Sequence, residues 1–402
     1  MIVNTTLVNE LFRGFYIQRW NDKIRPLELI EMDKHAHKMQ IAYCIGKYEE
    51  SAGNKVNWNN LILGGIFEFL RRIIISDIKS PIYYKIRNDN KEVFLKLSAW
   101  VYSQLEGIIN HPELQSYLKK YLLEDNFLDS LSKNILDAAH KYASYWEFRI
   151  IKHSNPDGYQ IHEIERDLMR ELGQYLDLDG MKKIISRQPI ADFIDLYGQL
   201  RYQIRWSQMP TIPRTSVLGH SFLVACLSYF FALENDACPR RLYNDFFGGL
   251  FHDMPEAVTR DIVFPVKSSS QEFELMIKTL EKDLAEKEIY PLIDVDWIDE
   301  IRYFIQEEFY NKVIIDGNVE MSDIKIEHIN SKYNEDSYNP IDGELIRAAD
   351  HLAGYLEAWH SSNFGIKSEE YVNAMKNIKE LYLNKMLGNF SLRELYNNYK
   401  IL

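Results

Sequence analysis

Four residues that can bind a metal ion stand at three separate places in this chain. His252 and Asp253 are adjacent and end an apolar run. His220 opens an apolar stretch, and Asp350 lies within the segment 345–355. Two imidazoles and two carboxylates suit a borderline divalent ion such as Mn, Fe, Co, Ni or Zn, and they leave positions for water and a substrate oxygen. An open site of this kind is typical of catalysis.

Helices must position these residues, because apolar residues recur at three and four spacing around them. The clearest helical segments are 61–75, 220–233, 272–289 and 296–310. Strand signals are scarce, and the clusters 155–158 and 339–343 are rich in turn-forming residues. The sequence therefore predicts an all-α fold in which three different helices contribute ligands.

Each candidate ligand also has a plainer interpretation. Buried polar side chains usually do no more than satisfy hydrogen bonds. For His220 or Asp350 taken alone this is the commoner role, and a single His-Asp pair occurs by chance in many chains. The four residues together favour a metal site.

The order His, then His-Asp, then Asp resembles the HD-domain metal-dependent phosphohydrolases. The segment 252–267 also contains a Glu four residues after its His, a Thr-x-Asp and a Pro-Val-Lys, which look like the bacterial 5'-deoxynucleotidase branch. That branch carries Arg-Trp ahead of the first His, and Arg205-Trp206 begins fifteen residues before His220.

The resemblance implies one divalent metal ion, of the set Mn, Co, Fe, Ni, Zn or Mg. It implies four ligands, namely His220, His252, Asp253 and Asp350. The remaining histidines show no further ligand spacing, which argues against the two-metal HD nucleases and cyclic-dinucleotide hydrolases.

The resemblance also assigns roles around the metal. Glu256 and Asp261 would exchange protons with the attacking water and the departing alkoxide. Arg205 would bind the phosphate, and Trp206 would pack against the sugar. Lys267 is a further candidate for binding substrate. The alternatives are that the two acids are solvated groups after a helix end, that the Arg-Trp pair is stacked on the surface, and that the lysine is a surface lysine.

A faint copy of the motif runs through the first half of the chain. Its members are Arg19-Trp20, His37, Glu68, Asp77 and the segment 138–147, which parallels 348–357. The interval from the copy's His to its Glu is 31 residues, against 32 between the two histidines of the second half, and the next interval is 9 in both. The pattern predicts two tandem HD-domain helical units, at 1–175 and 195–402.

The two copies differ in chemistry. Glu68, Phe69, Arg72 and His140 stand in place of His252, Asp253, Glu256 and Asp350. A phenylalanine cannot bind a metal, and an arginine cannot act as a general base. We expect the first half to pack against the second as an internal pseudo-dimer, because single-unit relatives commonly pair. A remnant metal site of His37, Glu68 and His140 is the alternative.

Composition narrows the possible partners and location. The net charge of −12 disfavours a broad nucleic-acid or anionic-membrane surface. The cysteines, Cys44, Cys226 and Cys238, are too few and too scattered for a disulfide framework or a thiolate metal site. No signal peptide or membrane-spanning run is evident, so we expect a cytoplasmic protein.

The sequence thus predicts a metal-dependent phosphohydrolase that cleaves a nucleotide phosphate ester, in particular a nucleoside 5'-monophosphate. One alternative is a regulatory or scaffold protein that binds a nucleotide without turning it over. Another is a nucleotide pyrophosphohydrolase. About 26 extra residues between the metal-binding helices of the second half, largely within 313–339, form either a lid or a surface insertion.

Overall fold

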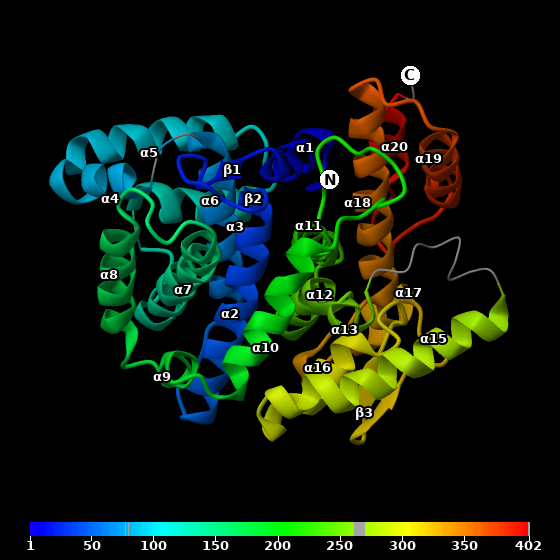
Figure 1. Cartoon of the computed structure of the whole chain (residues 1–402). Coiled ribbons are helices and arrows are strands. Elements are labelled where there is room, and N and C mark those ends of the chain that lie inside the picture. The colour runs from blue at the N-terminus through cyan, green and yellow to red at the C-terminus, as the bar shows by residue number, and fades with distance from the viewer. Residues whose placement is uncertain (77, 79, 125, 261–269, 401–402) are drawn as a thin grey trace.

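The computed structural model describes residues 1–76, 78, 80–124, 126–260 and 270–400. Asp261 and Lys267, both predicted to act at the site, and Asp77 of the first-half motif lie outside the described residues. Helices dominate the described chain, and strands form only two short two-stranded sheets (Figure 1). The predicted all-α class is confirmed.

The described part of the first half contains the α-helices α1 (Thr5–Phe12), α2 (Glu31–Ser51), α3 (Trp58–Ile75), α4 (Ser80–Asp89), α5 (Lys91–Leu105), α6 (Pro112–Lys119), α7 (Ser130–Ser154) and α8 (Ile161–Leu172). Two helices, α9 (Asp179–Ile185) and α10 (Pro189–Gly198), join the halves. The described part of the second half contains α11 (Val217–Glu234), α12 (Pro239–Phe251), α13 (Glu256–Thr259), α15 (Gln271–Leu284), α16 (Ile298–Ile305), α17 (Ile326–His328), α18 (Gly343–Asn363), α19 (Glu369–Tyr382) and α20 (Arg393–Asn398). The strands are β1 (Gln18–Arg19) paired with β2 (Leu29–Ile30), and β3 (Val313–Ile315) paired with β4 (Asn318–Glu320).

Helices α2 and α11 lie side by side at the centre of the molecule (Figure 1). One continuous cluster of buried apolar residues extends through both halves around them. Ser216 Oγ donates a hydrogen bond of 2.5 Å to Asp33 Oδ1 across this contact. The same hydroxyl accepts from the Gly219 amide, so it also caps the start of α11.

Helix α11 differs from expectation in one respect. The window Val217–Glu234, with a mean hydropathy of 1.6, is long and apolar enough to cross a membrane, although no membrane-spanning run was expected from the sequence. However, 89% of that window is buried inside the fold. A helix that is apolar on all sides is required here because α2, α12 and α18 all pack against it.

Helix α16 ends at Ile305 and does not continue to residue 310 as predicted. Lys312 explains the early end, because its buried ammonium donates to the carbonyl oxygens of Tyr303 and Gln306. A lysine at this place satisfies carbonyl groups that the helix leaves without an amide partner.

The insertion within 313–339 packs against the start of α12. Cys238 N donates to Asn334 Oδ1 at 2.9 Å, and Arg240 N donates to Asp336 Oδ1 at the same distance. Helix α12 has 13 residues, so about 20 Å separates this end from its other end, where His252 follows. This position fits a surface insertion and not a lid.

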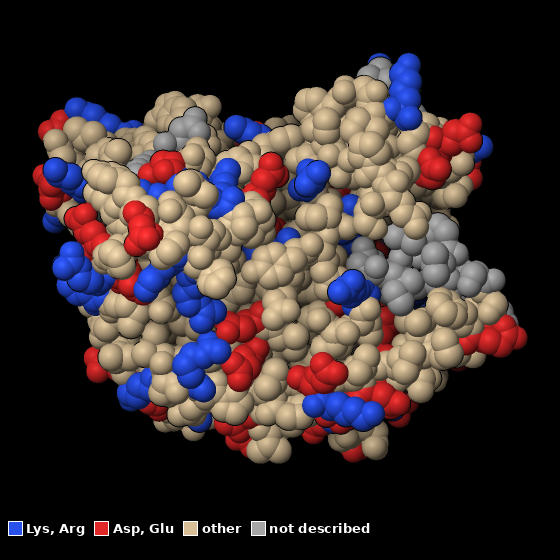
Figure 2. Space-filling view, in the orientation of Figure 1, with Lys and Arg blue, Asp and Glu red and all other residues tan. Residues whose placement is uncertain are grey.

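The charged surface is mixed in sign. On the face drawn in Figure 2, Lys and Arg side chains are interspersed with Asp and Glu. This face therefore offers no broad basic area of the kind that binds nucleic acid without sequence preference.

Candidate metal centre

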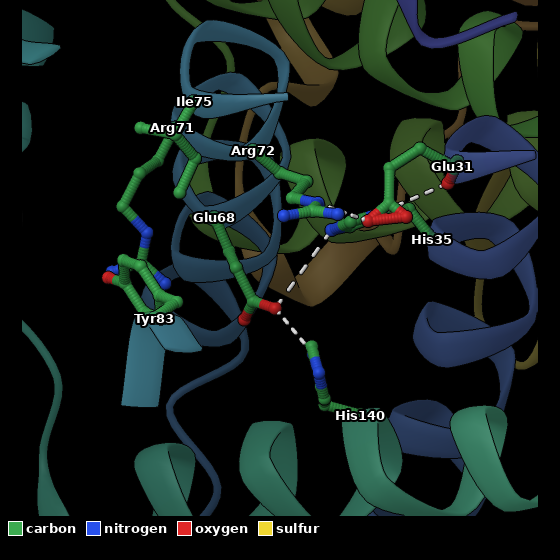
Figure 3. A pocket seen from close by; sticks show the side chains of 8 residues that line it. All are labelled: Glu31, His35, Glu68, Arg71, Arg72, Ile75, Tyr83 and His140. Atoms are coloured by element: carbon green, nitrogen blue, oxygen red, sulfur yellow. Dashed lines mark hydrogen bonds and ion pairs between the residues drawn. The ribbon is translucent and has the colours of Figure 1, made fainter. Parts of the chain in front are cut away.

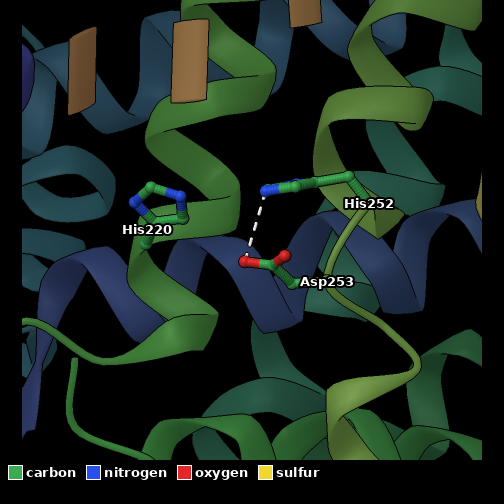
Figure 4. Close-up of side chains that lie close together, drawn as sticks. All are labelled: His220, His252 and Asp253. Carbon is green, nitrogen blue, oxygen red and sulfur yellow. Dashed lines mark ion pairs between the residues drawn. The ribbon is translucent and has the colours of Figure 1, made fainter. Parts of the chain in front are cut away.

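Three predicted ligands meet where α11 and α12 converge (Figure 4). His220 lies in the first turn of α11, while His252 caps the end of α12 and Asp253 follows it. One possible ligand atom from each residue lies within 4.8 Å of the other two. The tertiary structure thus joins residues that are 32 positions apart in the sequence.

Two packing features hold these helices together. A Cβ atom on Gly249 would lie 3.0 Å from the Ala225 backbone, so glycine allows α12 to approach α11 closely just before His252. Arg241 of α12 forms a fully buried ion pair with Asp342 at the start of α18, with Nε and Oδ2 2.6 Å apart. The second contact fixes α18, and with it Asp350, relative to α12.

Asp350 lies beside this group of three. Its Oδ1 accepts a hydrogen bond of 2.9 Å from His220 Nε2. These two atoms, each a predicted metal ligand, therefore face one another.

Glu357 orients His220 from the other side of the ring. His220 Nδ1 donates to Glu357 Oε1 at 3.1 Å, and the carboxylate is almost completely buried. A ring that donates from Nδ1 in this way directs Nε2 towards the centre. Glu357 was not predicted to belong to the site. Its position seven residues after Asp350, two turns along the same helix face, is a signal that could have identified it.

The Arg-Trp pair is fixed by the same carboxylate. Arg205 Nε and Trp206 Nε1 donate to Glu357 Oε2 at 3.1 and 2.8 Å. Arg205 Nη1 lies 3.8 Å from Asp253 Oδ2, and Nη2 lies 4.0 Å from Asp350 Oδ1. Arg205 is therefore a half-buried part of the centre, which does not fit the alternative of a stacked surface pair.

The ionisable groups stabilise each other's charges. Burial disfavours the charged form of His252, but the Asp253 carboxylate beside it raises the pKa of His252 to about 9. Burial likewise opposes ionisation of Asp253, while the attraction of His252 lowers its pKa to about 2. The pKa of Asp350 lies well below its usual range, because His220 and Arg205 outweigh the effect of burial. Both carboxylates are therefore ionised at neutral pH.

Two buried atoms at the centre show that its donor set fits a divalent cation. His252 Nδ1 hydrogen-bonds to the Gly249 carbonyl oxygen at 2.8 Å, so Nε2 is directed inward. His252 Nε2 and Asp253 Oδ2 face each other at 3.2 Å, but neither makes a hydrogen bond with the described residues. Buried polar atoms normally have such partners, and nitrogen and carboxylate oxygen are suitable ligands for these metals.

Two further carboxyl groups lie near the centre. Glu256 begins α13 and is only 7% exposed, which does not fit a solvated acid. Glu308 was not predicted, and no motif in the sequence indicates it. Burial raises the pKa of Glu308, and this carboxyl group interacts electrostatically with His252 and Asp253. A carboxyl group with a raised pKa can keep a proton closer to neutral pH.

The corresponding residues of the first half do not form the remnant metal site considered above. His37 Nε2 hydrogen-bonds to the Ile194 carbonyl oxygen at 3.0 Å, and the His37 ring packs against Trp146. Glu68 and His140 do meet, with Oε1 and Nδ1 2.7 Å apart, but Lys34 and Lys38 lie beside them.

Comparison with known proteins agrees with this geometry. Residues 197–379 match the family model described as HD domain. This segment is therefore similar to HD domains. The matched residues include all four predicted metal ligands of the second half. Neither the curated proteins nor the solved structures gave a match.

HD domains are in general metal-dependent hydrolases of a phosphohydrolase superfamily, and they bind divalent metals. The matched segment of this chain has a suitable group of His and Asp side chains where α11 and α12 converge.

Proposed function

We propose that the HD domain of this chain hydrolyses the phosphate ester of a nucleotide, in particular a nucleoside 5'-monophosphate. The observation that carries the proposal is the meeting of His220, His252 and Asp253 within 4.8 Å, with Arg205 beside them. This arrangement combines a cation site with a phosphate-binding guanidinium group.

One divalent ion would be held by His220, His252, Asp253 and Asp350. When bound, such an ion supplies Lewis-acid chemistry, because it polarises phosphate oxygens and makes water more acidic. We assign no particular metal among Mn, Co, Fe, Ni, Zn and Mg.

The chain's own residues would bind the substrate and move protons. Arg205 offers two Nη groups, and a guanidinium fork matches two oxygens of one phosphate group. Glu357 holds that fork and Trp206 in place through its Oε2 atom. Glu256, together with Asp261, would take a proton from the attacking water and return one to the departing alkoxide.

We further propose that the halves are tandem copies of one unit and pack as an internal pseudo-dimer. Matching contacts support this idea, because Arg19 Nε and Trp20 Nε1 both lie 2.9 Å from Glu147 Oε2. Arg205, Trp206 and Glu357 form the same arrangement. The strand pair Gln18↔Ile30 likewise has its equivalent in the bridge Ile204↔Ser216, with each residue shifted by 186 positions.

The test is phosphate release from a panel of nucleoside 5'-monophosphates and triphosphates by metal-stripped protein. The protein is resupplied with Mn, Co, Zn or Mg and compared with Asp253→Asn, which keeps the side-chain shape but removes a ligand charge. We expect metal-dependent release from a monophosphate that falls by roughly a hundredfold or more in the variant.

Asp299→Asn is the matched control, because Asp299 is an exposed acid on α16, far from the centre in sequence and 93% exposed. It should leave the rate unchanged. Release of pyrophosphate from triphosphates alone would contradict the choice of substrate. No release with any metal from folded protein would contradict hydrolysis itself.

A further inference from the structure

A second charged pocket lies in the first half, between α2, α3, α4 and α7 (Figure 3). The cavity has a volume of about 30 Å³ and opens to solvent. Glu31 and His35 of α2, Glu68 and Arg72 of α3 and His140 of α7 line it. The pocket is distinct from the metal centre and has no role in the proposed reaction.

Buried lysines supply much of the charge behind this pocket. Lys34 Nζ lies 2.7 Å from His140 Nδ1, and Lys38 Nζ lies 2.5 Å from Glu68 Oε2. Both lysines are completely buried. Burial lowers the pKa of Lys34 to about 7, so an anion close to its ammonium group would favour the protonated form.

Cationic side chains line this pocket and lie directly behind it. Among the described residues, Arg71 and Arg72 line it beside the carboxylates of Glu31 and Glu68, and the ammonium groups of Lys34 and Lys38 lie behind it. At the metal centre Arg205 instead stands beside the carboxylates of Asp253, Asp350 and Glu357, and two histidines lie next to them.

The residue that corresponds to His220 is a lysine and not the predicted His37. Helix α2 begins after Ile30 and α11 begins after Ser216, 186 residues later, which aligns Lys34 with His220. The contact of Lys34 with His140 accordingly has the same place as the contact of His220 with Asp350. An ammonium group thus stands where the second half has a metal ligand.

His35 provides an independent sign of a ligand. Its Nδ1 lies 3.1 Å from the carbonyl oxygen of Glu31, which can only accept, so Nδ1 carries the proton. Burial and the nearby Lys34 hold the pKa of His35 well below its usual range, and the ring is neutral. His35 Nε2 is therefore a buried acceptor that lines the pocket, and it makes no hydrogen bond with the described residues.

We propose that this pocket binds a phosphate group that retains one proton. Arg72 would face its charged oxygens, with the Lys34 ammonium behind His140, and its O–H group would donate to His35 Nε2. Inorganic phosphate near neutral pH offers both negative charge and such a proton. Sulfate has a similar shape and charge but has no O–H group, so this acceptor would discriminate against it.

The test measures phosphate binding by equilibrium dialysis with Arg205→Gln protein in the presence of a chelator, so that the metal centre contributes nothing. We expect one phosphate per chain and a dissociation constant for sulfate at least roughly tenfold higher. Arg72→Gln and Lys34→Met should each weaken phosphate binding at least tenfold. His35→Met should remove the preference for phosphate over sulfate.

Lys182→Gln, a change at an exposed lysine of α9, is the control and should leave binding unchanged. Circular dichroism and the melting temperature identify any variant that fails to fold. The ratio of the dissociation constants for sulfate and phosphate, measured on the Arg205→Gln protein, tests the proposal without any variant of the pocket. A nucleoside 5'-monophosphate is added as a competitor of bound inorganic phosphate. Displacement shows that the pocket also accepts a phosphate ester, its absence shows that only free phosphate binds, and either result supports the site. The proposal is overturned by the absence of bound phosphate, by binding that both charge variants leave unchanged, or by equal affinity for sulfate. None of these outcomes depends on hydrolysis by the HD domain.

Discussion

At the scale of single residues, Glu357 connects the parts of the metal centre. One carboxylate contacts His220 through Oε1 and both Arg205 and Trp206 through Oε2. It therefore fixes a metal ligand and the proposed phosphate-binding group at the same time. Groups that orient a metal ligand in this way usually affect metal affinity almost as strongly as the ligands do.

We expect Glu357→Gln to weaken metal binding by roughly 10- to 100-fold, because an amide neither holds the His220 ring as firmly nor balances the charge of Arg205. Titration calorimetry with Mn or Zn measures this change without any assay of activity. Glu147→Gln is the matched control, since Glu147 makes the equivalent contacts with Arg19 and Trp20 in the first half. An equal loss of affinity in both variants would show that the effect is a general destabilisation.

At the scale of secondary-structure elements, the contact between α2 and α11 contains a buried acid. Asp33 is 3% exposed and accepts a hydrogen bond from Ser216. Burial raises the pKa of Asp33 to about 6, although Arg201 and Ser216 favour its charged form. The folded protein therefore binds a proton more tightly at this position than the unfolded chain does.

This shift predicts how stability depends on pH. Because the folded pKa is the higher one, the free energy of unfolding should fall as pH rises from about 4 to about 6, by up to about 3 kcal/mol from this group. Asp33→Asn removes the titration, so its stability relative to the original protein should increase over the same range. Urea unfolding at pH 4, 5, 6 and 7 measures the difference, and parallel curves for the two proteins would contradict the assignment.

At the scale of the whole molecule, the two halves share one apolar core. Helix α11 is buried on all sides, partly by α2 of the first half, and Tyr43 of α2 also donates to Glu300 of α16 at 2.8 Å. An isolated second half would expose that surface to water, at a cost of about 25 cal/mol for each Å² of apolar area.

We therefore expect the segment 195–402, when expressed alone, to be aggregated or only partly folded. Co-expression with the segment 1–194, which is the first half together with its linker, should restore a soluble complex. Circular dichroism, the melting temperature and size-exclusion chromatography measure the outcome. A cooperatively folding 195–402 segment, with the stability of the full chain, would show that the halves are independent domains.

The sequence alone predicted the helical class, because the spacing of apolar residues is a local property that every helix displays. It also selected His220, His252, Asp253 and Asp350, because their types and order resemble a family motif, and the structure brings the first three together with the fourth beside them. The end of α16 at Ile305 could not be predicted in this way, since it accompanies hydrogen bonds from the Lys312 ammonium to the Tyr303 and Gln306 carbonyl oxygens, which the spacing of apolar residues does not report.

Only the tertiary structure decided which residues surround each centre. The roles of Glu357 and Glu308 depend on how α18 and the segment after α16 approach the metal ligands, and no spacing in the sequence reports such distances. The same is true of the first half, where Lys34 meets His140 while His37 hydrogen-bonds to the Ile194 carbonyl oxygen, because residues three positions apart on one helix have different partners. The sequence determines which chemical group each residue carries, whereas the packing of elements that are far apart along the chain determines the partners of that group.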